Sequence, residues 1–99
     1  MPLAFDDEQA PLYTVGQVAG MLDVQPAFLR RLDLEEVVRP ARSDGGQRRY
    51  SRTDIALVIH VASMATSGMT LPAIRRILVL EAENEALRRE IERLKANQR

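Results

Sequence analysis

The stretch Ser43–Ser51, SDGGQRRYS, decides how the fold of this 99-residue chain is interpreted. Its two adjacent glycines permit the positive φ angles that a tight hairpin turn requires, and the flanking residues alternate enough to form short strands. Arginines at the tip of such a hairpin would suit contacts with phosphate groups. The alternative is a solvated loop that merely joins two helices. The surrounding sequence has to decide between these interpretations.

The composition indicates one small domain, with room for an appended helix. The chain holds no cysteine, which excludes disulfides and cysteine-ligated metals, and its single histidine makes a catalytic triad or a histidine metal site improbable. We therefore expect no catalytic residues, no metal site, no cofactor and no enzymatic activity. No apolar run approaches the ~20 residues that span a membrane, and the N-terminus lacks the pattern of a signal peptide. These features predict a soluble cytoplasmic protein without a membrane partner.

The net charge is zero, with 14 basic and 14 acidic residues, but the two signs are unevenly distributed. Acidic residues open the chain, and residues 1–12 are expected to form a flexible acidic arm. Seven arginines lie within the 23 residues from Arg30 to Arg52, together with four acidic residues. A basic face therefore forms only if the fold separates the two signs.

The residues before the quoted stretch predict two short helices. Thr14 and Gln17 have the spacing of a capping box, and the apolar residues that follow predict a helix over 14–22. Pro26 suits the first turn of a second helix, because its missing N–H would have no partner there. Two short helices joined by so brief a turn predict a helix-turn-helix.

The residues around the quoted stretch predict a wing that leads into a third helix. Pro40 prevents the second helix from continuing, and short strands are expected around 38–42 and 47–50. Ser51 is placed to cap a helix that runs to about Ala65. The hairpin interpretation of the quoted stretch fits this order of elements better than the loop does.

The C-terminal residues predict a coiled coil. Thr70 is expected to cap a fourth helix, beyond which apolar residues recur in steps of three and four, with Asn84 at one core position. A lone helix of this kind is marginal in water, so the pattern implies a partner, and a second copy of the chain is the simplest one. The alternative is a helix folded back on its own domain. The expected dimerisation residues are Leu80, Asn84, Leu87, Ile91 and Leu94.

Four segments, in this order, resemble the MerR family of bacterial transcription regulators. They are YTVGQVAGMLDV (13–24), FLRRLD (28–33), VVRPARSDGGQRRYS (37–51) and MTLPAIRRIL (69–78). The chain is most similar to the heat-shock repressor branch, which has a similar Leu-Arg-x-x-Asp segment and a similar Gly-Gly-x-Arg-Arg-Tyr-Ser wing. The resemblance implies a mostly α winged helix-turn-helix, with a DNA-binding domain over 13–79 and a dimerising coiled-coil helix over 80–99.

The resemblance also implies which residues contact DNA. Arg30 falls on the recognition-helix arginine of the family, and Arg48 falls on the wing arginine that meets the phosphate backbone. Tyr50 occupies the position of the tyrosine that closes the wing, whose hydroxyl can reach a phosphate while its ring packs beneath. The expected recognition-helix residues are Gln25, Ala27, Arg30 and Arg31, and the expected wing residues are Arg42, Arg48, Arg49 and Tyr50.

Two functional hypotheses follow. In the first, the protein is a nucleoid-associated repressor without a small-molecule effector domain, and it binds an inverted-repeat operator on double-stranded DNA as a homodimer. The resemblance suggests that its coiled coil is antiparallel. In the second, it is a MerR-like protein-interaction module that modulates a chaperone or another protein partner. Glu35 and Glu36 favour the second hypothesis, because carboxylates beside the recognition helix would repel phosphate.

Overall fold

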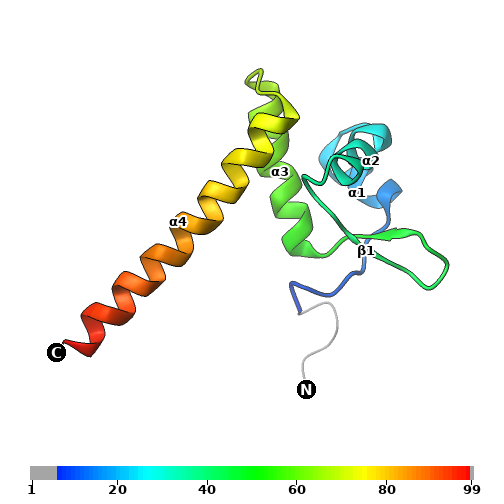
Figure 1. Ribbon diagram of the computed structural model, residues 1–99. Helices are drawn as coiled ribbons and strands as arrows, with labels where there is room; N and C mark the ends of the chain where they lie inside the picture. The colour runs from blue at the N-terminus through cyan, green and yellow to red at the C-terminus, as the bar shows by residue number, and fades with distance from the viewer. Residues whose placement is uncertain (1–6, 99) are drawn as a thin grey trace.

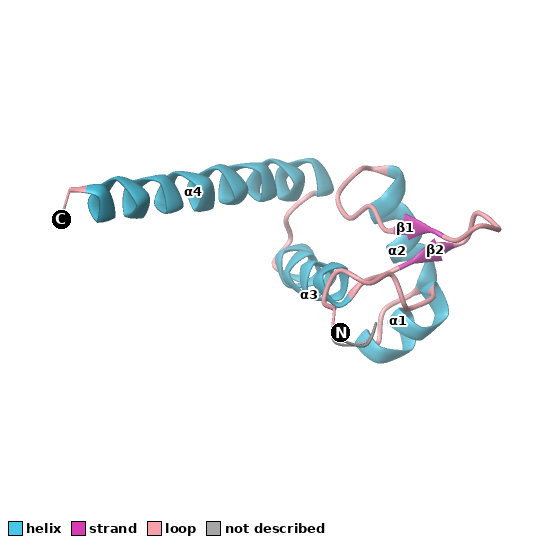
Figure 2. Cartoon of the chain, turned by 90° about the horizontal axis from the view of Figure 1, so that it is seen from below, coloured by secondary structure: helices cyan, strands magenta, loops and turns pink. Residues whose placement is uncertain are grey.

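The computed structural model describes residues 7–98, and within them a pair of short helices, a hairpin and two longer helices follow one another along the chain (Figure 1). The longest helix projects well beyond the other elements in both views (Figures 1 and 2). No helix in the described part is both long enough and apolar enough to cross a membrane. The elements are α1 (Val15–Leu22), α2 (Pro26–Leu34), β1 (Ala41–Arg42), β2 (Arg48–Arg49), α3 (Arg52–Thr66) and α4 (Leu71–Asn97).

Capping residues set the helix starts where the sequence predicts them. The Thr14 hydroxyl accepts a hydrogen bond from the Gln17 amide, and the Gln17 side chain accepts one from the Thr14 amide. Ser51 and Asp54 form the same reciprocal pair at the start of α3. Pro26 is the first residue of α2. These contacts satisfy amides that would otherwise lack partners, which confirms the predicted helix starts.

The hairpin predicted from the quoted stretch is present, but its strands are shorter than expected. Only Ala41–Arg42 and Arg48–Arg49 pair, in antiparallel register. The loop between them closes where the Ser43 amide donates to the Gln47 carbonyl at 2.7 Å, and Gly46 takes a φ of 81°. A left-handed residue is needed at that position, and only glycine adopts it without strain. One of the two glycines thus makes the turn.

The second strand is extended by one further pair, which joins the wing to the start of α1. The Tyr50 amide donates to the Tyr13 carbonyl at 2.7 Å, and the Tyr13 amide donates back at 3.0 Å. The wing is therefore fixed to the helix-turn-helix by backbone hydrogen bonds as well as by side chains.

The core lies where α1, α2, α3 and the start of α4 meet the base of the wing. Its side chains are apolar and include one aromatic ring, and they come from every helix of the described chain. Burying a large aliphatic side chain stabilises a fold by roughly 1.5–3 kcal/mol. The least exposed members are Val18, Leu29, Leu32, Val38, Tyr50, Val58, Val61 and Ile74.

Part of the expected acidic arm is attached to the domain. The Thr53 amide donates to the Glu8 carbonyl at 3.1 Å, and the Gln9 side chain donates to the Thr53 hydroxyl at 2.9 Å. A flexible arm was expected over residues 1–12. These bonds instead hold residues 8 and 9 against the start of α3. Residues 1–6 of that arm lie outside the described residues.

Helix α4 runs without interruption through the expected boundary between residues 79 and 80. Leu71 and Ile74 are buried against the core, whereas every described residue from Val79 onward is exposed. No glycine or proline lies between the two parts, so the helix has no reason to break. The division into a domain over 13–79 and a dimerisation helix over 80–99 remains a prediction, and Arg99 lies outside the described residues.

Candidate nucleic-acid interface

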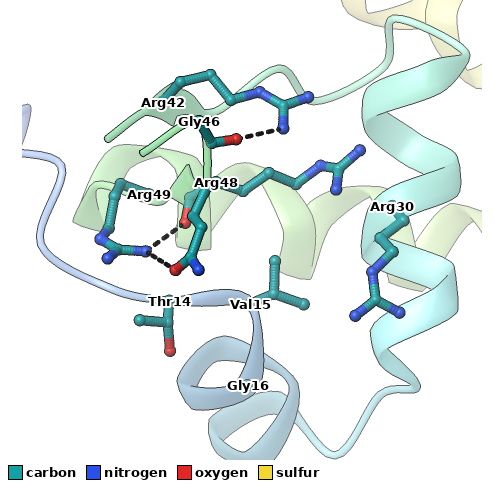
Figure 3. Close-up of a pocket in the computed structure, with 9 residues that line it drawn as sticks. Thr14, Val15, Gly16, Arg30, Arg42, Gly46, Arg48 and Arg49 are labelled. Carbon is teal, nitrogen blue, oxygen red and sulfur yellow. Dashed lines mark hydrogen bonds between the residues drawn. The ribbon is translucent and has the colours of Figure 1, made fainter. Parts of the chain in front are cut away.

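A hollow of about 400 Å³ lies between the wing, α2 and the start of α1, and four arginines line it (Figure 3). Arg30 reaches it from the exposed side of α2, opposite the buried Leu29 and Leu32. Arg42 and Arg48 extend from the two wing strands toward α2, and Arg49 points to the other side of the wing (Figure 3). The other lining residues are Thr14, Val15, Gly16, Gly46 and Gln47.

The start of α1 also lines this hollow. Val15 and Gly16 belong to the first turn of the helix, where amides have no acceptor within the helix. Such amides and the positive end of the helix dipole favour an anion. Sequence reasoning did not assign Thr14, Val15 and Gly16 to the site, although the capping box at Thr14 marked a helix start there.

Asp33, near the end of α2, holds two of the arginines in place. Its Oδ2 accepts from Arg48 Nε at 2.7 Å and from Arg42 Nη2 at 2.9 Å. The side chains of Asp33 and Arg48 are 12% and 16% exposed, so this contact is shielded from solvent more than the others in the site. Asp33 therefore fixes the wing against α2. Sequence reasoning missed this role, although Asp33 belongs to the Leu-Arg-x-x-Asp segment.

Replacing Asp33 with alanine is expected to lower the free energy of unfolding by about 1–3 kcal/mol, because Arg48 then lacks a partner in a shielded position. Urea denaturation monitored by circular dichroism measures this loss. Asp44→Ala at the exposed wing tip is the matched control and should change little. Equal midpoints for the two variants would contradict the role given to Asp33.

Arg49 is positioned by its own strand. Its guanidinium donates to the Arg48 carbonyl at 3.1 Å and lies 3.5 Å from the Gln47 amide oxygen (Figure 3). Neither Arg49 nor Arg30 forms an ion pair within residues 7–98. The charge of Arg30 is therefore available to an anion in the hollow, whereas the guanidinium of Arg49 is directed to the other side of the wing (Figure 3).

The other predicted recognition-helix residues lie outside this hollow. Gln25 and Ala27 are exposed near the start of α2. Arg31 is exposed too, but its Nε donates to Glu35 Oε2 at 2.6 Å. Contacts of these three residues with DNA remain predictions, and of the expected recognition-helix set the structure brings only Arg30 together with the wing arginines.

Tyr50 closes the wing with its side chain inside the core. The residue is 1% exposed, and its hydroxyl is buried without a hydrogen-bond partner among the described residues. Burial raises the pKa of the Tyr50 phenol, and the neighbouring Arg48 lowers it in part. The ring that closes the wing thus packs inside the core, as expected, and the contact of its hydroxyl with a phosphate remains a prediction.

Tyr50→Phe is expected to stabilise the fold by about 1 kcal/mol, because it removes a buried hydroxyl that lacks a partner. The raised pKa means that stability is intact below about pH 10 and is lost as the pH rises through the folded-state pKa. The variant should lose this alkaline sensitivity, which thermal denaturation at pH 8 and pH 11 measures. A Tyr50→Phe protein less stable than wild type at pH 8 would contradict this role for the hydroxyl.

Glu35 and Glu36, which were expected to repel phosphate, line a different hollow on the side of α4. Glu35 pairs with Arg31 in its own helix. Glu36 Oε2 accepts from Arg75 Nη2 at 2.9 Å, and its other oxygen lies 3.5 Å from Arg39. Both carboxylates are thus neutralised by arginines of the chain and do not line the arginine hollow.

The apolar residues expected at the dimer interface form an exposed row on α4. Leu87 is 63% exposed and Ile91 is 50% exposed, with Leu80 and Leu94 close to that value. Asn84 is also exposed, and its side-chain oxygen lies 3.3 Å from Arg88 Nε. Nothing in the described chain covers this row, so the alternative of a helix folded back on its own domain is wrong.

Comparison with known proteins identifies relatives whose sequences match most of the chain. A heat shock protein, HspR, of Streptomyces coelicolor is 36% identical over 75 residues, which are 75% of this chain and 50% of that protein. The regulator GlnR of Bacillus cereus is 24% identical over 84% of this chain and 65% of its own length. The chain thus spans about half to two thirds of these curated relatives.

Solved structures share the fold. The N-terminal part of MtaN, the multidrug transporter activator of Bacillus subtilis, superposes with a TM-score of 0.63 at 27% identity, over 84% of this chain and 88% of that one. HiNmlR, a MerR family regulator lacking the sensor domain, bound to promoter DNA, gives a TM-score of 0.61 at 21% identity, over 84% and 79%. The family model for MerR HTH family regulatory proteins matches residues 13–80. The chain therefore belongs to the MerR family of helix-turn-helix regulators.

Proposed function

We propose that the protein is a sequence-specific DNA-binding transcriptional repressor that binds an inverted-repeat operator as a homodimer. The arginine hollow carries this proposal, because it places Arg30 of α2 beside three wing arginines and the amides of an α1 N-terminus. The fold thereby gathers positive charge on one face of a chain whose net charge is zero. Such a face fits the phosphate backbone of double-stranded DNA.

The site has two kinds of contact. The wing arginines and the amides of Val15 and Gly16 would hold phosphates, which orients the protein and makes its affinity depend on salt. The exposed side of α2 would enter the major groove, where Arg30 can donate two hydrogen bonds to a guanine. Gln25, Ala27 and Arg31 are the further candidates for base contacts.

The exposed row on α4 supports a homodimer. Four large apolar side chains at coiled-coil spacing lie open to solvent on one helix, which is unfavourable unless a partner covers them. The charges flanking the row favour an antiparallel pair, because acidic residues occupy its first half and basic residues predominate in its second half. The acidic residues are Glu81, Glu83 and Glu85, and the basic ones are Arg88, Arg89, Arg93 and Lys95.

An antiparallel pair centred near Leu87 aligns Leu80 of one chain with Leu94 of the other. It also brings each acidic half beside a basic half, whereas a parallel pair would place like charges together. The two recognition helices would then lie at opposite ends of the pair. Such a dimer can occupy successive major grooves, about 34 Å apart.

Two relatives support this function. HiNmlR was solved bound to promoter DNA, and HspR is named as a heat shock protein. A dimer seated on a promoter represses by excluding or distorting the transcription machinery. We extend the same arrangement to this protein, with a chaperone as a further candidate partner.

The alternative, a protein-interaction module that no longer binds DNA, drew its support from Glu35 and Glu36. Both carboxylates pair with arginines of their own chain, away from the arginine hollow. DNA binding is therefore the better supported of the two functions.

A titration of labelled duplexes tests the proposal. One duplex carries the inverted repeat obtained by selection from random DNA, and the other carries a single half-site. We expect two chains to bind the repeat cooperatively and more tightly than the half-site. Recovery of no preferred sequence, or binding of one chain per repeat, would contradict the proposal.

A further inference from the structure

Glu36 occupies a backbone position at the end of α2 that normally requires glycine. Its φ is 59°. Its amide donates to the Asp33 carbonyl at 3.0 Å, and the next amide, that of Val37, donates to the Leu32 carbonyl at 2.8 Å. This pair of bonds is the Schellman motif that ends many helices, with Glu36 at its left-handed residue.

A glutamate is strained there, because its Cβ crowds the backbone in the left-handed conformation. Glycine would form the same hydrogen bonds without that cost. A strained residue that persists at such a position points to a role for its side chain. The contacts of Glu36 indicate what that role is.

The side chain of Glu36 joins two parts of the molecule. Its Oε2 accepts from Arg75 Nη2 of α4 at 2.9 Å, while Oε1 lies 3.5 Å from Arg39 in the segment that leads to the wing. The carboxylate therefore links the end of the recognition helix and the start of the wing to the second turn of α4.

The link spans a region where apolar packing is incomplete. A hollow of about 720 Å³ opens between α3, α4 and the end of α2, and Glu36 and Arg75 both line it. His60 of α3 and Glu81 of α4 meet at 2.9 Å beside the same hollow. Because side chains do not fill this space, close packing alone does not fix the direction in which α4 leaves the domain.

We infer that Glu36 is a positioning residue that, through Arg75, sets the angle between α2 and α4. This inference rests on the proposed function. In a dimer joined through α4, that angle determines the distance between the two recognition helices, and hence the spacing of the half-sites that the protein prefers. Neither residue needs to touch DNA, since neither lines the arginine hollow and both line a different one.

The test measures affinity for duplexes that carry two copies of the selected half-site at separations increased one base pair at a time. Wild type, Glu36→Gly and Arg75→Gln are compared, and Glu35→Ala is the matched control because Glu35 pairs only within its own helix. Glycine suits the backbone at residue 36, so the key variant should fold at least as well as wild type.

We expect Glu36→Gly and Arg75→Gln each to reduce the preference for the best spacing over its neighbours by about fivefold. This factor corresponds to the upper end of the free energy that an exposed ion pair contributes. Affinity for a single half-site should stay within about twofold of wild type in both variants. The double variant should be no worse than either single one, because both changes break the same link.

Spacing profiles of Glu36→Gly and Arg75→Gln that superimpose on those of wild type and Glu35→Ala would overturn the inference while leaving the proposed function intact. A wild-type protein that binds no inverted repeat at any spacing would overturn the proposed function, and the inference would fall with it.

Discussion

Replacing Arg30 with alanine is expected to weaken operator binding by about 10- to 100-fold, the range for a side chain that donates two hydrogen bonds to a base. Arg30 lines the arginine hollow, is exposed, and forms no ion pair within the described residues. Its removal therefore leaves no buried charge behind, and the fold should be unaffected. Fluorescence anisotropy with the selected operator and with single-base variants of it measures the loss.

The sequence dependence of the loss separates a base contact from a phosphate contact. If Arg30 reads a base, its alanine variant should tolerate changes at one position of each half-site that wild type rejects. Arg76→Ala is the matched control, since Arg76 is an exposed arginine of α4 outside the arginine hollow. Equal affinities of Arg30→Ala and Arg76→Ala for the operator would contradict the assignment of α2 as the recognition helix.

Replacing Leu87 with aspartate is expected to raise the dissociation constant of the dimer about 100-fold or more, and operator binding should fall with it. In the proposed antiparallel pair Leu87 meets its own counterpart, so each dimer would bury two charges in place of two leucines. In the single chain Leu87 is 63% exposed, which means that the substitution does not disturb the core. Sedimentation equilibrium measures the dissociation constant directly.

Ala86→Asp provides the control for this substitution. It adds the same charge one residue earlier, where the coiled-coil pattern places the side chain away from the partner. That variant should dimerise like wild type and bind the operator normally. Equal dissociation constants for Leu87→Asp and wild type would contradict the use of the exposed row on α4 as the dimer interface.

The helix boundaries were predictable because local contacts set them. Two capping pairs form within a single turn, Thr14 with Gln17 and Ser51 with Asp54. The spacing of these residues in the sequence is therefore enough to predict their hydrogen bonds. The strands were harder to delimit, because their pairing joins residues on opposite sides of the turn at Gly46 and is not set within one segment. The continuity of α4 followed from the absence of a helix breaker, although a change of pattern near residue 80 suggested a division.

The site was predictable in part. The wing arginines were expected because their side chains suit phosphate, and Arg30 was assigned through the resemblance to the family. The role of Asp33 was missed because its partners, Arg42 and Arg48, lie 9 and 15 residues away and meet it only through folding. The packing of the Tyr50 ring beneath the wing was expected from the resemblance, but the burial of its hydroxyl without a partner depends on contacts that form only through folding. The contact between Glu36 and Arg75 spans 39 residues and has no local signal.

The most direct test of the central claim is selection of genomic DNA fragments by the purified protein at two salt concentrations. We predict enrichment of a short inverted repeat, with an affinity that falls steeply as salt rises, because several arginines neutralise phosphates at once. Failure to enrich any sequence at the lower salt concentration would contradict the claim, and would indicate instead that the arginine hollow binds something other than DNA.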